Sequence, residues 1–392
     1  MPIPSTVEIL RDLVAFPTVS RQSNLALLDH VERLLTPAGA RVERFAHPDG
    51  TRANLWVTVG PEGPGGVVLS GHTDVVPVAG QDWTTDPFEL AEKDGRLYGR
   101  GTADMKGFVA AALRAALLAS GRDLRTPLHL ALSYDEEIGC LGVRGMIGAL
   151  AARPERPALC IVGEPTGMRI AAGHKGKAAF RACCHGREGH SALAPQALNA
   201  LHLGARFIAA LQARQEEIDR SGPRDPDYDI PYSTIHAGLM RGGSALNIVP
   251  NRCEIDFEIR NIAGDDPALI LEGIARDADE IARPFRARFP EAGIGIEALS
   301  GYPGLDAPPD SPAVRFLRQV TGDNGSAIKV AFGTEAGLFH DNLGIPTAIC
   351  GPGFMEQGHK PDEFVERAQL DGCDRMLGEV VEALAAGLGG RS

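Results

Sequence analysis

The chain has 392 residues, 44% of them apolar and 23% charged, which is typical of a folded globular protein and argues against a disordered chain. This length allows a substantial hydrophobic core and predicts two domains. Lys and Arg total 39 against 51 Asp and Glu, so the formal net charge is -12. Such a charge repels phosphate backbones and anionic membranes, and we expect neither a nucleic-acid nor a membrane partner.

The cysteine pattern and the N-terminus indicate the compartment. Seven cysteines are scattered without a CxxC pair, and most lie within apolar runs, as expected for reduced core residues of a cytoplasmic protein. In residues 1–20 charges interrupt every apolar stretch, and no later run approaches the ~20 apolar residues of a membrane span. We therefore expect a cytoplasmic protein without an export or anchoring signal.

Four short segments are apolar nearly throughout, a pattern that is typical of strands buried on both faces of a sheet. They are residues 67–71, 128–133, 159–163 and 347–351. Helical patterns lie between them, including an apolar face at helical spacing that follows Asp104. The sequence predicts an α/β fold with a mixed, largely parallel sheet between layers of helices.

Residues 247–260 behave differently, because apolar and charged side chains alternate along them as in a sheet with one face in water. The neighbouring segments predict strands at 178–185, 233–240 and 293–299, and helices at about 197–215 and 266–288. This order, β-α-β-β-α-β, is that of a split βαβ unit, the ferredoxin-like α+β arrangement.

The two kinds of strand predict an inserted domain. We expect a small α+β domain at 178–303 within a larger α/β domain formed by 1–177 and 304–392. Both joints are rich in turn-forming residues, with GHKGK before the insertion and GYPGLDAPPDSP after it.

Polar residues follow the buried strands, where ligands bind in open α/β sheets. They are His72, Asp74, Asp135, Glu136, Glu137, Glu164 and His359, and Asp104 precedes a predicted helix. Each has an ordinary explanation: Asp104 as a helix N-cap, Glu136 and Glu137 as a solvated turn, His359 as a surface histidine. All these explanations would have to coincide at one edge of one sheet.

This set of side chains suits a metal site. Two imidazoles and three or four carboxylates, with no cysteine, are ligands for Zn²⁺, Co²⁺ or Mn²⁺. More carboxylates than one ion can use implies two ions bridged by a carboxylate. We expect His72 to be a ligand and Asp74 to hydrogen-bond its other ring nitrogen and fix the tautomer.

Seven motifs carry a resemblance to a known family. In chain order they are SGHTDVVPV, GRGTADMKG, SYDEEIG, VGEPT, GREGHSA, LNIVPNRCEIDFEIR and GHKPDEF. With them the chain closely resembles the di-metal amidohydrolases and exopeptidases that include acetylornithine deacetylase, succinyl-diaminopimelate desuccinylase, aminoacylase and carboxypeptidase G. The motifs are spread over nearly the whole chain.

The resemblance implies a ligand set for two divalent metal ions, zinc first and cobalt or manganese as alternatives. Asp104 would bridge the two ions. His72 and Glu164 would complete one site, and Glu137 and His359 would complete the other.

The same resemblance implies the catalytic residues. Glu136 would act as general base and acid, and Asp74 would be the partner of His72. The inserted domain would serve as a lid and as the dimerisation domain of a homodimer. His190, in GREGHSA, would then stabilise the oxyanion in the other subunit; without the motif, a surface histidine near a turn is the alternative.

Substrate recognition is also implied by position. Arg260 matches a residue that binds the α-carboxylate of the substrate, and Asn247 matches a polar contact near the reacting carbonyl. Thr334 and Glu335 belong to a Thr-Glu-Ala stretch that is similar to the one in acetylornithine deacetylases. By this resemblance, Glu335 of the present chain could pair with the δ-ammonium of ornithine. A surface arginine and an early-helix acid are the alternatives for Arg260 and Glu335.

Together the resemblance implies a cytoplasmic, homodimeric hydrolase that deacetylates N²-acetyl-L-ornithine to L-ornithine and acetate in arginine biosynthesis. Alternatives within the family are a succinyl-diaminopimelate desuccinylase, an aminoacylase and a dipeptidase, all acting on small acylated amino acids or peptides. A metal-dependent binding or scaffold protein without turnover is a further alternative. A nucleotide-binding protein is disfavoured because no glycine fingerprint follows a strand.

Overall fold

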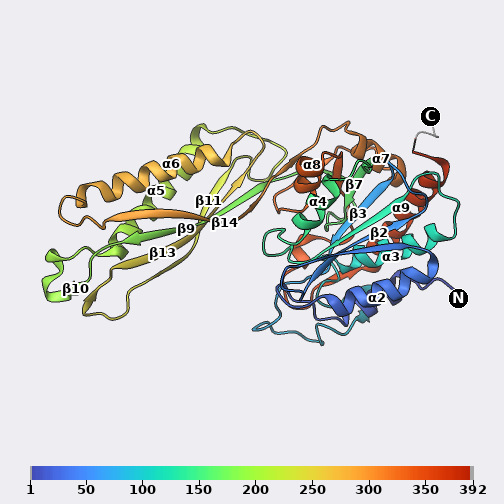
Figure 1. Ribbon diagram of the computed structural model, residues 1–392, viewed down its shortest axis with the longest axis horizontal. Coiled ribbons are helices and arrows are strands. Elements are labelled where there is room, and N and C mark those ends of the chain that lie inside the picture. Colours follow the sequence, from blue (N-terminus) through green and yellow to red (C-terminus); the bar gives the residue numbers. More distant parts are fainter. Residues whose placement is uncertain (1, 389–392) are drawn as a thin grey trace. The chain divides into compact units, whose positions relative to one another are not determined.

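The structure is a computed structural model that describes residues 2–388 (Figure 1). The chain divides into two compact units. The larger unit consists of the described parts of Met1–His174, Leu305–Val330 and Thr334–Ser392, and the smaller unit consists of Lys175–Gly304 and Ala331–Gly333. The smaller unit thus begins and ends at 175 and 304, where the sequence predicted 178 and 303, and it also takes in 331–333.

A nine-stranded mixed sheet forms the centre of the larger unit. Its order is β1 (Arg41–Ala46), β2 (Ala53–Val59), β6 (Leu128–Ser133), β3 (Val67–His72), β7 (Leu159–Val162), β17 (Thr347–Ile349), β8 (Ala171–His174) and β15 (Leu305–Asp306), and β16 (Ile328–Val330) pairs with β8. The four central strands, β6, β3, β7 and β17, are mutually parallel. The predicted mixed, largely parallel sheet is confirmed.

Seven α-helices of the described chain belong to the larger unit: α1 (Thr6–Val14), α2 (Leu25–Leu35), α3 (Lys106–Ser120), α4 (Val143–Ala151), α7 (Pro312–Thr321), α8 (Ala336–Leu343) and α9 (Arg367–Ala386). Helix α3 lies against β3 and β6 and is packed between α1 and α9, which explains why its alanine-rich sequence is buried almost all round. Helices α4 and α8 pack against each other (Figure 1). Within residues 2–388 we find no helix long and apolar enough to cross a membrane.

A small three-stranded sheet ties distant segments of the larger unit together. It consists of β4 (Ala91–Lys93), β5 (Arg96–Tyr98) and β18 (Phe364–Glu366), with β5 in the middle. The segment before α3 and the segment before α9 are therefore hydrogen-bonded neighbours. Short 3₁₀ turns complete the described chain at Thr36–Ala38, Ser191–Gln196, Arg283–Phe285 and Met355–Gln357.

The smaller unit is a four-stranded antiparallel sheet in the order β11 (Thr234–Gly242), β13 (Arg252–Asn261), β9 (Gly176–His185) and β14 (Gly293–Tyr302). Helices α5 (Ala200–Ser221) and α6 (Pro267–Ala282) cover one face (Figure 1). The alternating residues of β13 send Cys253, Ile255, Phe257 and Ile259 into this core. The predicted β-α-β-β-α-β order is observed.

One detail of the smaller unit differs from the prediction. Residues 247–260 form two strands, β12 (Ile248–Val249) and β13, because Pro250 between them has no N–H to donate to a ladder. Strand β12 pairs with β10 (Gly189–His190) in a separate two-stranded sheet.

Candidate metal centre

The polar residues that follow the central strands converge at the carboxyl edge of the large sheet. His72 is the last residue of β3, Glu136 and Glu137 follow β6, and Glu164 follows β7. Asp104 comes from the loop before α3. His359 comes from the loop before β18. The structure therefore brings together all five residues that the sequence predicted as metal ligands.

Asp104 lies between the two histidines. Its Oδ1 is 3.1 Å from Nε2 of His72, and its Oδ2 is 3.1 Å from Nε2 of His359. Oε2 of Glu137 lies 3.0 Å from the same nitrogen of His359, and Oε1 of Glu164 lies 3.9 Å from Nε2 of His72. One carboxylate thus faces two separate groups, as expected of a bridging ligand.

The chemistry of these side chains fits divalent cations. Two overlapping sets, one of His72, Glu136 and Glu164 and one of His72, Asp104 and Glu137, have potential ligand atoms within 4.8 Å of one another. Burial, with repulsion from neighbouring carboxylates, raises the pKa of Glu136 to about 8 and the pKa of Glu137 to about 7. Oε1 of Glu137 is buried and has no hydrogen-bond partner among the described residues. A cation bound among these carboxylates would lower the raised pKa values and would give Oε1 of Glu137 a partner.

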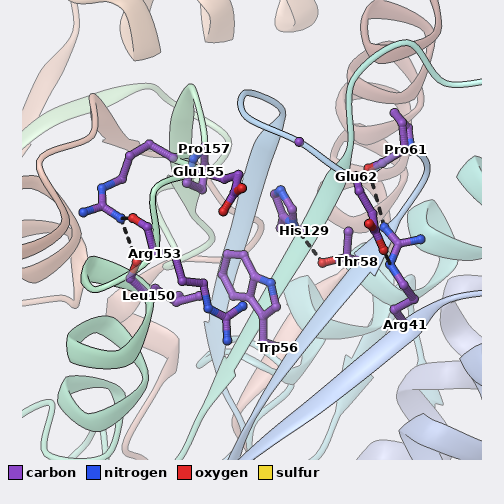
Figure 2. A pocket seen from close by; sticks show the side chains of 12 residues that line it. Arg41, Trp56, Thr58, Pro61, Glu62, His129, Leu150, Arg153, Glu155 and Pro157 are labelled. Carbon is purple, nitrogen blue, oxygen red and sulfur yellow. Dashed lines mark hydrogen bonds and ion pairs between the residues drawn. The ribbon is translucent and has the colours of Figure 1, made fainter.

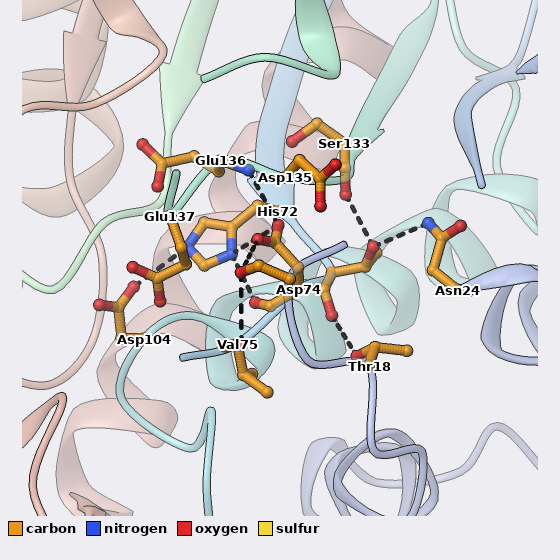
Figure 3. A network of polar contacts seen from close by, with 12 residues as sticks. Thr18, Asn24, His72, Asp74, Val75, Asp104, Ser133, Asp135, Glu136 and Glu137 are labelled. Carbon is orange, nitrogen blue, oxygen red and sulfur yellow. Dashed lines mark hydrogen bonds and ion pairs between the residues drawn. The ribbon is translucent and has the colours of Figure 1, made fainter. Parts of the chain in front are cut away.

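The ring of His72 is held by the main chain of Asp74 (Figure 3). Nδ1 lies 2.8 Å from the Asp74 carbonyl oxygen and 3.6 Å from its carboxylate. A carbonyl can only accept, so Nδ1 carries the proton and Nε2 faces Asp104. The expected link between Asp74 and His72 is present, but the carbonyl makes it.

The Asp74 carboxylate binds the turn that carries Glu136. It accepts a hydrogen bond from the Ser20 hydroxyl at 2.7 Å. It also accepts one from the backbone N–H of Glu136 at 3.0 Å (Figure 3). The Glu136 carboxylate in turn accepts from the Cys140 thiol, with Sγ 3.1 Å from Oε1. Asp74 and Cys140 therefore hold the backbone and the side chain of Glu136.

Two ordinary explanations fail in the structure. Asp104 is not the N-cap of α3: Met105 occupies that position, and no side chain caps the helix. The acidic turn after β6 is not solvated, since Asp135 and Glu136 are buried. Asp135 pairs with the Arg52 guanidinium at 2.5 Å and thereby supports the turn. Of this turn, only the next two residues, Glu136 and Glu137, contribute carboxylates to the cluster.

Thr334 and Glu335 lie in the interior of the larger unit, where they directly precede helix α8. The Thr334 hydroxyl accepts from the backbone N–H of Ala336 at 2.9 Å. Oε2 of Glu335 accepts from Ser70 at 3.1 Å, while its Oε1 has no hydrogen-bond partner among residues 2–388. Burial raises the pKa of Glu335 to about 7.

The predicted residues of the smaller unit fall into two places. His190 pairs with Ile248 across β10 and β12, and the carbonyl of Asn247 accepts from the backbone N–H of Ser191 at 3.0 Å. Arg260 lies at the other end of β13, where it donates to Glu258 at 2.9 Å and to the Tyr302 hydroxyl at 2.8 Å.

These two places are far apart. Arg252, at the end of β13 near His190, and Arg260 are eight positions apart along the strand, a span of roughly 26 Å at ~3.3 Å per residue. Within the smaller unit, Arg260 is therefore not brought together with His190 and Asn247.

Sequence reasoning missed several residues that support the cluster. Glu363 stands in the same motif as His359, and Arg100 in the same motif as Asp104, but sequence alone does not show that they pair. No pattern in the sequence pointed to Cys140 or Gln81.

A hollow of about 300 Å³ lies at the amino edge of the same sheet (Figure 2). Trp56 and His129 stack in its wall, with ring centroids 4.8 Å apart. Its arginines already have partners: Arg41 donates to the Gly60 carbonyl at 3.0 Å and Arg153 to Glu43 at 2.7 Å. Arg156, the third, donates to carbonyls at the end of α4.

Comparisons with known proteins agree with this geometry. Residues 68–383 match the model of peptidase family M20/M25/M40. Acetylornithine deacetylase of Proteus mirabilis is 34% identical over 97% of both chains, and that of Yersinia pseudotuberculosis is 33% identical over 97% of this chain and 98% of its own.

Solved structures show the same fold. An M20 family metallo-carboxypeptidase from Sulfolobus solfataricus has a TM-score of 0.78 at 19% identity, covering 98% of this chain and 100% of its own. A dinuclear metal-binding M20 peptidase from Bacillus subtilis has a TM-score of 0.69 at 16% identity, with 97% of each chain covered. The predicted resemblance is confirmed, and the protein is a hydrolase that acts on amide bonds. The chain belongs to peptidase family M20/M25/M40.

Proposed function

We propose that this protein is a two-zinc hydrolase that removes the acetyl group from N²-acetyl-L-ornithine, in the cytoplasm, as a step of arginine biosynthesis. The observation that carries the proposal is the cluster in which the buried carboxylate of Asp104 faces His72 and His359 through its two oxygens. The relatives named acetylornithine deacetylase, at 34% and 33% identity over nearly the whole chain, support the choice of substrate.

The contacts of the cluster support the proposed ligand set. Asp104 would bridge the two ions, with His72 and Glu164 around one of them and Glu137 and His359 around the other. When bound, the ions supply an activated water and polarise the amide carbonyl. The donor set of nitrogen and carboxylate oxygen favours zinc, and cobalt or manganese would also fit.

Glu136 is the proposed proton carrier. It would take the proton of the attacking water and deliver it to the nitrogen of ornithine as the C–N bond breaks, which yields acetate and a free amine. The Cys140 thiol occupies Oε1, and this leaves Oε2 for the proton. Asp74 fixes the backbone of Glu136.

The proposal includes a homodimer formed through the smaller unit. His190 would stabilise the oxyanion, Asn247 would contact the reacting carbonyl, and Arg260 would bind the substrate carboxylate. The roughly 26 Å of β13 between the two places supports this, because one small substrate cannot touch both within a single copy. The edge strand β11, with Leu239 51% exposed and Met240 41% exposed, offers an apolar surface for self-association.

Mixing two inactive variants tests the dimer. Glu136→Gln lacks the base and His190→Ala lacks the oxyanion donor, so heterodimers would contain one intact site if His190 acts in the other subunit. We expect partial recovery of activity after subunit exchange. Exchange demonstrated by mass spectrometry with no recovery contradicts a role of His190 across subunits.

Glu335 is the proposed partner of the δ-ammonium of ornithine. Its buried Oε1, without a hydrogen-bond partner among the described residues, supports this role, because an ammonium would satisfy it. Glu335→Gln should raise KM for N²-acetyl-L-ornithine at least ~10-fold, which corresponds to about 1.4 kcal/mol of binding free energy. The KM for N-acetyl-L-norvaline, which lacks the δ-ammonium, should not change. Equal loss on both substrates would instead indicate a structural role for the carboxyl group.

A substrate panel tests the central proposal. Purified protein is stripped with a chelator, restored with Zn²⁺ or Co²⁺, and given N²-acetyl-L-ornithine, succinyl-diaminopimelate, N-acetyl-L-methionine and a dipeptide. We expect activity only in the metal-restored protein and the highest kcat/KM on N²-acetyl-L-ornithine. A preference for another substrate would refute the deacetylase proposal, and metal-loaded protein inactive on every substrate would favour a non-catalytic binding protein.

A further inference from the structure

Three side chains outside the proposed ligand set join the loop of Asp104 to the loop of His359. They are Glu363, Arg100 and Gln81. Glu363 and Arg100 are each 1% exposed, so this part of the connection is buried within the larger unit, whereas Gln81 is partly exposed. Strands β5 and β18 bring the two loops alongside each other, and the Glu363 carbonyl accepts from the backbone N–H of Gly99 at 2.9 Å.

Glu363 holds the backbone of Asp104. Its Oε1 accepts from the backbone N–H of Ala103 at 2.9 Å and from that of Asp104 at 3.1 Å. Its Oε2 accepts from Nη1 of Arg100 at 2.6 Å. A carboxylate with three donors of this kind fixes the peptide from which the bridging side chain projects.

Gln81 continues the connection to His359. Its Oε1 accepts from Nη2 of Arg100 at 2.6 Å and from the indole N–H of Trp83 at 3.1 Å. Its Nε2 donates to the backbone carbonyl of His359 at 3.0 Å. The Arg100 guanidinium also lies over the Trp83 ring, 5.0 Å from its centroid.

His359 needs such a hold more than the other proposed ligands. Its side chain is 48% exposed, whereas those of His72 and Asp104 are 1% and 4% exposed. Its backbone has a φ of 61°, in the left-handed region that a non-glycine residue adopts only when its surroundings enforce it. The ring of His359 therefore has fewer packing contacts than that of His72, and its position depends more on how the backbone is held.

We propose that Gln81, Arg100 and Glu363 are positioning residues for the proposed metal ligands. Glu363, paired with Arg100, holds the backbone of the bridging Asp104, and Gln81 holds the backbone of His359 and so sets the affinity for the metal ion held by Glu137 and His359. The inference rests on the proposed two-metal function. A ligand must sit within about 0.5 Å of its productive position, and the partners that orient ligands typically contribute 10- to 100-fold in metal affinity. Among the described residues Gln81 makes its hydrogen bonds to Arg100, Trp83 and His359, so we expect its substitution to act mainly on the ion held by Glu137 and His359.

Gln81→Glu tests this with the least disturbance. The substitution is isosteric and keeps an acceptor for Arg100 and Trp83, but it replaces the donor to the His359 carbonyl with a repelling oxygen. Gln81 is only partly buried, so the variant should fold. Glu363→Gln is the second variant. Gln212→Glu, at an exposed position of α5, adds the same charge elsewhere and serves as the matched control.

The measurement is calorimetric titration of chelator-stripped protein with Zn²⁺, together with the visible spectrum of the Co²⁺ form at one and two equivalents. We expect Gln81→Glu to bind the first ion like wild type, to bind the second ion 10- to 100-fold more weakly, and to show a changed spectrum for the second cobalt only. Gln212→Glu should match wild type in both.

The outcomes separate this inference from the proposed function. In one outcome, wild type binds two ions, and Gln81→Glu binds both as tightly and shows an unchanged cobalt spectrum. This result overturns the positioning role and leaves the hydrolase proposal intact. Wild type that binds fewer than two ions overturns both.

Discussion

Both edges of the large sheet carry charged side chains, but the partners of these side chains differ. At the amino edge, Arg41, Arg153 and Arg156 each have carbonyl or carboxylate partners. At the carboxyl edge, carboxylates face one another and two imidazoles, and Oε1 of Glu137 has no partner among the described residues. Buried charge without a partner distinguishes the metal centre from the amino-edge hollow. Burying an unpaired charge costs folding free energy unless a bound ligand provides the partner.

The largest expected effect comes from one substitution made at both edges. Glu136→Gln should lower kcat on N²-acetyl-L-ornithine by about 10³-fold, because general acid–base catalysis is worth 10²- to 10⁴-fold, and it should leave metal content unchanged. Glu155→Gln, in the wall of the amino-edge hollow, is the matched control and should keep wild-type kcat. If Glu136→Gln retained its rate, or Glu155→Gln lost it, the two edges would not differ as described.

At the amino edge, His129 should make the free energy of unfolding depend on pH. Burial, with the nearby cations of Arg41 and Arg153, lowers the pKa of His129 from 6.5 to about 4. The unfolded chain therefore binds this proton first as pH falls. The stability that His129 contributes is complete above pH 6.5 and falls between pH 6.5 and 4, by roughly 3 kcal/mol in total.

Urea unfolding at several pH values, followed by tryptophan fluorescence, measures this loss. Trp56, which stacks on His129, is one of only two tryptophans in the chain. In His129→Gln the free energy of unfolding should fall less between pH 6.5 and 4 than in wild type. Parallel pH profiles for the two proteins would show that His129 is not held neutral.

The smallest expected effect concerns the exposed pair of the amino edge. The side chains of Arg153 and Glu43 are 37% and 47% exposed, so their ion pair is screened by water. Arg153→Ala should lower the free energy of unfolding by less than about 1 kcal/mol and leave kcat/KM unchanged. A larger change in either quantity would mean that the hollow is more than a surface feature.

The carboxyl edge was predictable because strand ends meet there whatever the loops do. Short apolar runs identified β3, β6 and β7, and the polar residues after them had to share an edge. The role of Asp74 was less accessible, since sequence does not show whether a carbonyl or a carboxylate faces His72. The link from Glu363 to Gln81 depends on the pairing of β5 with β18, two short strands more than 200 residues apart, for which no periodic signal exists.

The most direct test of the central claim is to count metal. Protein dialysed against trace zinc and then against metal-free buffer should retain two zinc ions per chain by elemental analysis. Asp104→Asn should retain at most one, because the bridging charge is lost while the fold is kept, as circular dichroism would verify. Wild type without zinc, or Asp104→Asn with two ions, would contradict the account of the carboxyl edge as a two-metal site.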